Sequence, residues 1–282
     1  MLQLHTFKTA VEFLNKSEPE LESDECCNNL LLGLAYTLVE DPRKFGSDPF
    51  FAIVENKGKN ELFALMTPPV KPVLYASHDA IGESCNSLAS YFKSINIKVP
   101  GVIGPRIVAE TFANVYSTIH RCTVNLSMKM RIYQLAKVME PKMANGFFRA
   151  AEEKDILILN KWIDEFYLDV FKGRKNVIKD DAAELIRNSD LYVWENNGIV
   201  SMVNRTRPTR HGYVIATVYT PEQFRNRGYA TAVVSSLCQF ILNSGKTFCS
   251  LFADLANPTS NSIYRKIGFK PVRDFYDYSF EE

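Results

Sequence analysis

The chain has 282 residues, of which 46% are hydrophobic and 23% are charged, and its formal net charge at pH 7 is +1. This length exceeds the usual size of one domain, so we expect two domains, and the composition is that of a soluble globular protein with a sizeable core. The near-neutral charge argues against binding to nucleic acid or to an anionic membrane surface, because both need a concentrated basic surface.

Cysteine and histidine spacing gives no sign of a metal site. The 6 cysteines and 4 histidines form no C-x-x-C pair and no Cys/His ligand set, so we expect no bound metal. The N-terminus lacks the basic-then-apolar layout of a signal peptide, and no apolar run is long enough to span a bilayer. We therefore expect a protein of the reducing cytoplasm, and whether it is a monomer or a homodimer stays open.

The N-terminal half is predicted to alternate between strands and helices. Strands are expected at residues 50–55, 62–66 and 73–76, a helix at 82–94, a strand and turn at 99–105, and a second helix at 106–119. Residues 128–138 end this half, and residues 140–145 are expected to form a linker.

The C-terminal half begins with an expected strand at 146–150, a helix at 155–171 and a short helix at 181–188. A hairpin follows, because Asn196-Asn197-Gly198 is a strong turn signal between two apolar runs. The basic stretch at 204–211 is interpreted as a solvated loop between strands, with contact to an anionic substrate as the alternative. The remaining elements are strands at 213–219, 248–254 and 271–280, and a helix at 230–242.

The most informative segment joins the strand at 213–219 to the helix at 230–242. It has the sequence Pro-Glu-Gln-Phe-Arg-Asn-Arg-Gly-Tyr-Ala over residues 221–230. The first amides of a helix have no partners within it and the helix dipole adds partial positive charge, so such a turn can bind a phosphate. Gly228 permits a backbone shape that a side chain would block, and Arg225 and Arg227 add charge. Taken alone, the segment is better explained as an ordinary turn with solvated arginines.

A second motif follows the strand at 248–254. Asn257 before Pro258 predicts a helix start with Asn257 as N-cap, and Gly268 closes this short helix. Ser260 and Tyr264 are four residues apart and therefore share one face of the helix, with Asn257 one turn below.

Together the two motifs resemble those of the GNAT superfamily of acetyl-coenzyme A-dependent N-acyltransferases. Residues 225–230 are similar to the family's pyrophosphate loop, (Arg/Gln)-x-x-Gly-x-(Gly/Ala), and residues 257–269 to its Asn-x-x-(small)-x-x-x-Tyr-x-x-x-Gly-Phe segment. The resemblance covers roughly residues 147–282 and implies a central mixed sheet of α/β type flanked by helices. One departure is Asn226, where many relatives carry glycine, and it puts only the packing of the loop in doubt.

The resemblance implies a binding site for acetyl-CoA as co-substrate. Backbone groups of residues 218–220 would meet the pantetheine arm, and amides of residues 225–231 would hold the pyrophosphate. Asn257 and Ser260 would contact the coenzyme from the far side. The expected coenzyme-binding residues are Val218, Tyr219, Thr220, Arg225, Asn226, Arg227, Gly228, Tyr229, Ala230, Thr231, Asn257, Ser260 and Tyr264.

Tyr264 is the candidate general acid, because the resemblance places it near the thioester sulfur. A phenol with a pKa of about 10 is a suitable proton donor for a departing thiolate. Without the motif, Tyr264 would be interpreted as a packed helix tyrosine. No general base is identified: residues 213–220 include no acid, and the nearest candidates are Glu195, Asp254 and His211. We expect Asp254 to cap the next turn, and water could equally take the proton.

The N-terminal half repeats the succession of the C-terminal half: a hairpin, a strand, a helix, a strand and a helix. We therefore expect two tandem GNAT-like domains, at residues 1–139 and 146–282, of which the first is degenerate. Its turn at Gly104-Pro105 lacks the Arg-x-x-Gly-x-Ala loop, so this half is expected to bind no coenzyme. An unrelated α+β domain is the alternative.

The predicted function is transfer of an acetyl group from acetyl-CoA to a primary amine of a small molecule or peptide. The alternative is an acyl-CoA-binding sensor or scaffold, in which the N-terminal domain holds a partner and no acyl group moves. A longer acyl donor is a further alternative, since pocket depth cannot be predicted from the sequence.

Overall fold

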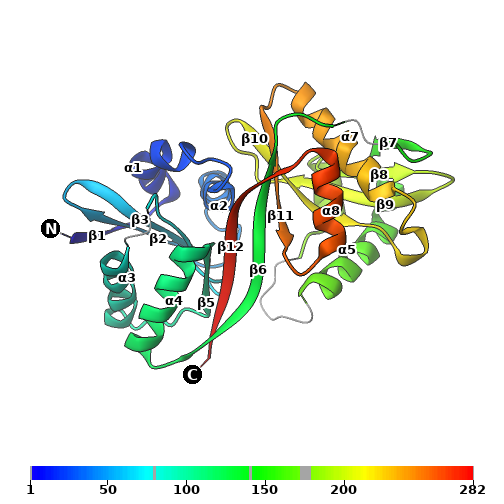
Figure 1. The fold of residues 1–282 in the computed structure, drawn as a ribbon. Helices are drawn as coiled ribbons and strands as arrows, with labels where there is room; N and C mark the ends of the chain where they lie inside the picture. The colour runs from blue at the N-terminus through cyan, green and yellow to red at the C-terminus, as the bar shows by residue number, and fades with distance from the viewer. Residues whose placement is uncertain (1, 79–80, 140–141, 172–178, 282) are drawn as a thin grey trace. The chain divides into compact units, whose positions relative to one another are not determined.

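The computed structural model describes residues 2–78, 81–139, 142–171 and 179–281. The chain divides into two compact units (Figure 1). Unit 1 consists of Met1–Ile132, Asp254–Ala256 and Val272–Glu282, and unit 2 of Tyr133–Ala253 and Asn257–Pro271. Residues 140 and 141 of the expected linker lie outside the described residues.

Unit 1 contains a mixed sheet with the strand order β1-β2-β3-β4-β5-β12-β6. Neighbouring strands from β1 to β4 are antiparallel, β4 and β5 are parallel, and β12 runs antiparallel to β5. The elements are β1 (Leu2–Phe7), α1 (Ala10–Glu22), α2 (Asn29–Glu40), β2 (Phe50–Asn56), β3 (Lys59–Met66), β4 (Val73–Tyr75), α3 (Gly82–Ser94), β5 (Gly101–Pro105), α4 (Arg106–His120), β6 (Thr123–Leu135) and β12 (Lys270–Glu281).

Strand β2 explains why the sheet of unit 1 is covered on both faces. Its residues from Phe51 to Val54 are all buried, because a continuous apolar run suits a strand that packs on both sides. Phe51 lies 5.4 Å from Phe13 of α1, measured between ring centres. Ala52 and Val54 belong to the core formed with α3 and α4. Helices therefore flank this sheet on both sides.

Unit 2 contains a second run of strands, in the order β11-β10-β9-β8-β7. Strands β7 to β10 are antiparallel neighbours, whereas β10 and β11 are parallel. The elements are β7 (Phe147–Ala150), the 3-10 helix η1 (Glu153–Asp155), α5 (Ile156–Phe171), α6 (Ala182–Arg187), β8 (Leu191–Glu195), β9 (Ile199–Thr206), β10 (Gly212–Tyr219), the 3-10 helix η2 (Glu222–Phe224), α7 (Tyr229–Asn243), β11 (Phe248–Asp254) and α8 (Pro258–Ile267).

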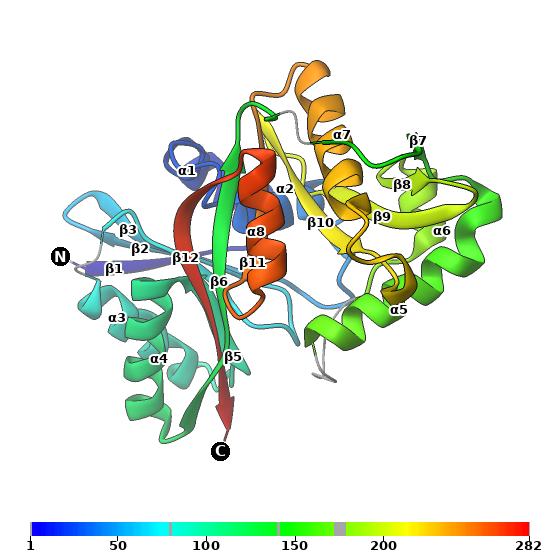
Figure 2. The same cartoon turned by 45° about the vertical axis from the view of Figure 1, so that its right-hand side comes forward.

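Two buried clusters cover the two faces of these strands. One joins α7 and α8 to the sheet and includes Leu237, Ile267 and Leu251. The other joins α5 to the opposite face and includes Trp162 and Met202. In Figure 2, strands β8 and β9 run between α7 and α5. The fold class is therefore confirmed as a mixed α/β sheet flanked by helices.

Local signals placed most elements within two residues of their observed ends. The cap residues explain this accuracy in unit 2: the Asn257 side chain accepts from the Ser260 amide at 3.0 Å, and Gly268 ends α8 with φ 114°. Among the strands and α-helices, four were not predicted from the sequence, namely β1, α1, α2 and β6. Pro19 inside α1 and the partly exposed face of β6 weaken the periodic signals there.

Two expectations about topology need correction. The last strand forms at the expected residues, but its residues 275–279 pair with β5 in unit 1 rather than completing the C-terminal unit. Each compact unit joins segments that are far apart in the sequence, and the expected domain ranges 1–139 and 146–282 stay a prediction. In element order, α3 follows β4 as α7 follows β10. The counterpart of the loop at 225–228 is thus the segment between Tyr75 and Gly82, not Gly104-Pro105, and residues 79 and 80 of it lie outside the described residues.

Candidate functional site

The strands β10 and β11 separate after a short paired section. Their register covers Gly212, Tyr213 and Val214 of β10, and pairing ends at Val214 with Ser250, although both strands continue and are fully described. On its other edge, β10 stays paired with β9 as far as Tyr219. Residues 215–219 therefore present one backbone edge, within the sheet, that no strand of unit 2 covers. An extended ligand can add to such an edge by main-chain hydrogen bonds.

A β-bulge lies at the point where β10 leaves its neighbour. The register with β9 shifts between Ala216 and Tyr219, and Thr217 has φ 47°. This left-handed conformation is unusual for a β-branched residue. The bulge redirects the end of β10, where Ser201 Oγ donates to Tyr219 O at 3.1 Å and lies 2.8 Å from Thr220 Oγ1. The expected pantetheine-binding residues 218–220 thus lie directly after the bulge.

The start of α7 lies immediately beyond this strand end. Gly228 is the N-cap with φ 82°, Asn226 has φ 62°, and no side chain caps the helix. The first hydrogen bond of the helix runs from Ala232 N to Gly228 O at 3.0 Å. The amides of Tyr229, Ala230 and Thr231 therefore have no partner within the helix. This arrangement has the donors and the dipole that a phosphate needs.

The two arginines of the loop differ in their surroundings. Arg225 Nε donates to Thr220 O at 2.9 Å, and its Nη2 lies 3.4 Å from Asp169 Oδ2. Arg225 thus braces the loop against the end of β10, although the sequence motif suggests a contact with phosphate. Arg227 is exposed beside Gly228, so of the two it is the arginine placed to add charge for an anion.

Helix α8 carries the remaining expected residues. Asn257 is exposed at its start, Ser260 is half-buried, and Asn261 accepts from Tyr133 Oη at 2.8 Å through its Oδ1. Tyr264 is buried in the cluster that α7 and α8 form with the sheet, and Val218 packs against the same cluster. The tertiary structure therefore brings the acid candidate and the end of β10 to one region.

The environment of Tyr264 keeps its phenol protonated. Burial raises the pKa of Tyr264 well above its ordinary value, and the neighbouring Cys238 thiol adds to the increase. A neutral phenol retains its proton through the physiological pH range, as a general acid requires. The ring also contacts Phe269 at 5.9 Å between centres, so packing holds its orientation.

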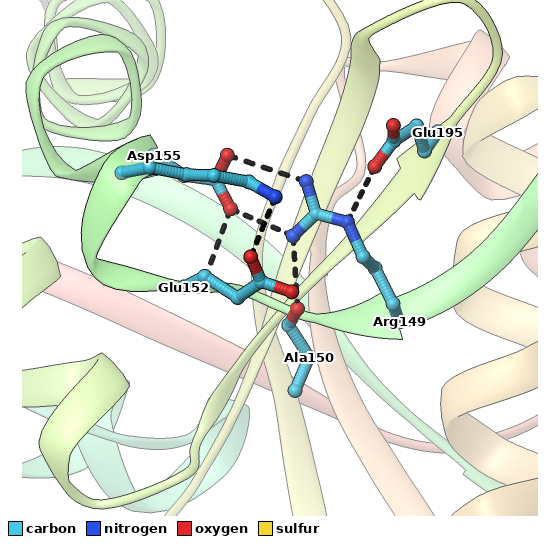
Figure 3. A network of polar contacts seen from close by, with 6 residues as sticks. Arg149, Ala150, Glu152, Asp155 and Glu195 are labelled. Atoms are coloured by element: carbon cyan, nitrogen blue, oxygen red, sulfur yellow. Dashed lines mark hydrogen bonds and ion pairs between the residues drawn. The ribbon is translucent and has the colours of Figure 1, made fainter.

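The carboxylates considered as a base already have structural partners. Glu195 accepts from Arg149 Nε, and Arg149 also binds Asp155 Oδ2 at 2.7 Å, as Figure 3 shows. Asp254 accepts from the Ala256 amide at 2.8 Å, as expected for a cap. His211, the third residue considered as a base, is exposed and lies directly before β10. Its backbone carbonyl accepts from the Thr247 amide at 2.8 Å.

A polar cluster that was not predicted from the sequence lies at the bulge, on the face covered by α5. Asp180 Oδ2 accepts from Thr217 Oγ1 at 2.8 Å and from Asn204 Nδ2 at 3.3 Å, and the Asp180 amide donates to Tyr167 Oη at 3.3 Å. Asp180 lies beside an ordinary helix-capping residue, Asp181, and no local pattern distinguishes it. Its position next to the end of β10 comes from tertiary packing alone.

The basic stretch at 204–211 is not the solvated loop expected. Asn204 is buried in β9, and Arg205 pairs with Asp190 at 2.8 Å. Arg207 has its guanidinium carbon 5.5 Å from the centre of the Phe252 ring, and its Nε is buried without a hydrogen-bond partner. Burial lowers the pKa of Arg207 to about 10, against the opposing effect of the Asp180 charge. In the later part of the stretch, Pro208, Arg210 and His211 are exposed, whereas Thr209 is buried.

The described ranges contain neither a metal-binding cluster nor a helix that could span a membrane. Within them, no three His, Cys, Asp or Glu side chains are grouped so that they could hold a metal ion. No helix in the same part of the chain has the length and apolar character needed to traverse a bilayer.

The chain is similar to one known protein family and to several solved structures. Residues 199–276 match the family model described as FR47-like protein, which is GNAT-related. No curated protein matches the sequence. Three similar solved structures are an acetyltransferase from the GNAT family from Colwellia psychrerythraea (11% identity, TM-score 0.59, 99% of this chain and 100% of that chain), a GCN5-related N-acetyltransferase from Sphaerobacter thermophilus (13%, 0.59, 99% and 95%), and a tandem GNAT protein from the clavulanic acid biosynthesis pathway (8%, 0.54, 100% and 98%).

These matches confirm the resemblance to the GNAT superfamily. The family model covers the part of the chain that carries both motifs, and the likeness to a tandem GNAT protein extends over the whole chain. At these identities the solved structures establish the fold alone.

Proposed function

We propose that this chain, which has the GNAT fold, transfers an acetyl group from acetyl-CoA to a primary amine of a small molecule or peptide. One observation carries the proposal: the uncovered edge of β10 after Val214 leads directly to the uncapped start of α7 at Gly228. A ligand with an extended, amide-containing arm and a diphosphate fits both features at once.

The binding roles follow from these two features. The edge of residues 218–220 pairs with the pantetheine amides, and the amides of residues 228–231 bind the diphosphate, with Arg227 adding charge. Asn257 and Ser260, at the start of α8, contact the coenzyme from the other side. When bound, acetyl-CoA supplies an activated acyl group.

The chemistry then requires the amine nitrogen to bond to the acyl carbon while the carbon–sulfur bond breaks. A backbone amide near Val218 or Tyr219 faces the thioester oxygen and stabilises its developing negative charge. The Tyr264 hydroxyl gives its proton to the departing sulfur, and the amine loses one proton to a base or to water. Holding both reactants in one orientation supplies roughly 7–11 kcal/mol in well-aligned cases.

A coenzyme-binding sensor without turnover is the second candidate. This candidate is favoured because Glu195 and Asp254, the two carboxylates considered as a general base, already accept hydrogen bonds from structural partners. Calorimetry with CoA and acetyl-CoA, followed by thiol release with a panel of amines, separates the two candidates. Binding with amine-dependent thiol release supports the enzyme, binding with no release for any amine supports the sensor, and no binding of either ligand contradicts both.

The N-terminal half completes the proposal. We assign residues 1–139 to a degenerate GNAT-like domain without coenzyme and residues 146–282 to the catalytic domain. Most of the last strand of the catalytic domain belongs to unit 1. The segment that corresponds to the pyrophosphate loop, between Tyr75 and Gly82, contains no arginine. We also propose that the protein is located in the reducing cytoplasm, on the basis of the spacing of its cysteines.

A further inference from the structure

We propose that the acceptor is an amino acid or a similar small amine with a carboxylate, held with its carboxylate at Arg207 and its amine at Asp180. This inference rests on the proposed function, and it names the substrate class of that same site.

Unsatisfied buried polar atoms mark the place. Among the described residues of unit 2, the buried side-chain atoms without a hydrogen-bond partner are Asn204 Oδ1, Arg207 Nε and Ser250 Oγ. Asn204 is 1% exposed and Ser250 is 0% exposed. Buried polar groups normally have partners, and an unmade bond at a buried group is costly. A polar ligand that forms hydrogen bonds with these three atoms explains why they are buried without partners in the protein.

The strand register places these atoms on one face of the sheet. Val214 pairs with Ser250, and Ala216, two residues further along β10, pairs with Asn204. Side chains two apart on a strand share a face, so these residues point the same way. Met202, two residues before Asn204, belongs to the cluster with α5. The unsatisfied atoms therefore face α5, away from α7 and α8.

Arg207 reaches across this face. Its guanidinium lies over the ring of Phe252, which is two residues after Ser250 and hence on the same side. Within the described residues, no carboxylate forms an ion pair with Arg207. A guanidinium presents a planar fork of donors that matches a carboxylate, and one arginine balances its single charge. The surroundings of Arg207 thus select a carboxylate over a neutral group.

Asp180 supplies the opposite charge nearby. Its carboxylate affects the pKa of Arg207 but does not pair with it directly. Two opposite charges held apart match a ligand that carries opposite charges at separate ends. Asp180 Oδ2 also accepts from Thr217, the residue before Val218. An ammonium at Asp180 is therefore close to the strand end where the acyl group is expected, and Asp180 is placed to take its proton.

The test compares amino acids with their own carboxamides, which differ only in the charged end. Calorimetry uses the full chain, with and without saturating CoA, and a panel of α-, β- and γ-amino acids, each paired with its carboxamide. We expect at least one amino acid to bind about tenfold or more tightly than its carboxamide, since a hydrogen-bonded charge is worth that much. Equal binding of each pair, or no binding by any member, overturns the inference.

Variants then assign the preference to Arg207. Arg207→Gln is expected to remove the preference while CoA binding is retained, and Arg210→Gln, at an exposed position of the same stretch, is expected to keep it. A preference that survives in Arg207→Gln overturns the inference. If Arg207→Gln does not fold, Arg207→Lys replaces it, because lysine keeps the charge but lacks the planar fork of donors. The comparison of amino acids with their carboxamides in the wild type then still tests the inference.

The outcomes separate this inference from the proposed function. Failure to bind CoA contradicts the proposed function, and titration of the unliganded chain with the same pairs still decides whether Arg207 selects a carboxylate. Replacing a β-amino acid by phosphoethanolamine distinguishes a carboxylate site from a general anion site: equal or tighter binding of phosphoethanolamine contradicts the carboxylate assignment.

Discussion

Thr217 Oγ1 donates a hydrogen bond of 2.8 Å to Asp180 Oδ2 and so connects two segments that are 37 residues apart in the sequence. Thr217 lies in the bulge of β10, with φ 47°, and Asp180 lies directly before α6. The bond holds a carboxylate beside the strand end that is expected to bind the thioester. The strained backbone of the bulge thereby places a charge at the proposed reaction centre.

Replacing this carboxylate tests its role with the amine. Asp180→Asn keeps the size of the side chain and removes its charge, so kcat/KM for an amine acceptor should fall roughly ten- to a hundredfold. CoA affinity, measured by calorimetry, should not change. Asp181→Asn is the matched control, because asparagine caps a helix as well as aspartate does. Equal rates for the two variants would show that Asp180 does not contact the amine.

Gly228 allows a test of the diphosphate site. Gly228→Val places a β-branched residue at φ 82°, which costs about 1–2 kcal/mol and crowds the approach to the helix amides. We expect CoA affinity to fall about tenfold or more. Gly245→Val provides the control at φ 97°, past the other end of α7. It should lower the melting temperature similarly and leave CoA affinity unchanged; a similar loss of affinity in both variants would point to general destabilisation.

The role of Tyr264 is tested by removing its hydroxyl. Tyr264→Phe should lower kcat by roughly 10²–10⁴ with little change in CoA affinity, because only the proton donor is lost. Burial raises the pKa of Tyr264, so in the wild type its proton stays in place beyond pH 10, and activity should not fall from its ionisation below that point.

Tyr192→Phe is the control for that experiment, since the Tyr192 hydroxyl donates to Ser189 O at 2.8 Å and has no role in the proposed mechanism. Initial rates with acetyl-CoA across pH compare the three proteins. Full activity of Tyr264→Phe throughout this range would remove the tyrosine from the mechanism.

The Arg149 network is predicted to be structural. Arg149→Met removes the guanidinium that pairs with Asp155, whose side chain is 8% exposed, and should lower the free energy of unfolding by about 3 kcal/mol. Burial alone raises the pKa of Asp155, but the bonds and charge of Arg149 outweigh it and lower this pKa. This contribution is therefore present above the ordinary carboxyl pKa and is lost as the pH falls through the lowered value.

Urea denaturation at pH 7 and at pH 3 measures that contribution. Arg106→Met is the control, because Arg106 pairs with Glu110 on an exposed helix surface, where solvent screens the pair, and it should change stability much less than Arg149→Met does. Equal losses in the two variants would show that the Arg149 network adds nothing beyond a surface pair.

Local chemistry in the sequence was sufficient to predict most of the elements and to identify the two motifs. Asn257, Pro258 and Gly268 mark the ends of α8 because capping and φ preferences act within a few residues. The loop before α7 was predicted for the same reason, since a helix start and a glycine at positive φ are local features. The fold class followed from the succession of these elements.

Pairings and contacts between distant residues were decided only by the tertiary structure. The strand at Lys270–Glu281 was expected where it forms, yet its partner is β5, because strand propensity carries no information about which edge a strand joins. Arg207 was interpreted as solvated, but it packs over Phe252. Asp180 lies beside the end of β10 because it accepts a hydrogen bond from Thr217. Burial and long-range contacts depend on how the whole chain packs, so the composition of a short segment cannot reveal them.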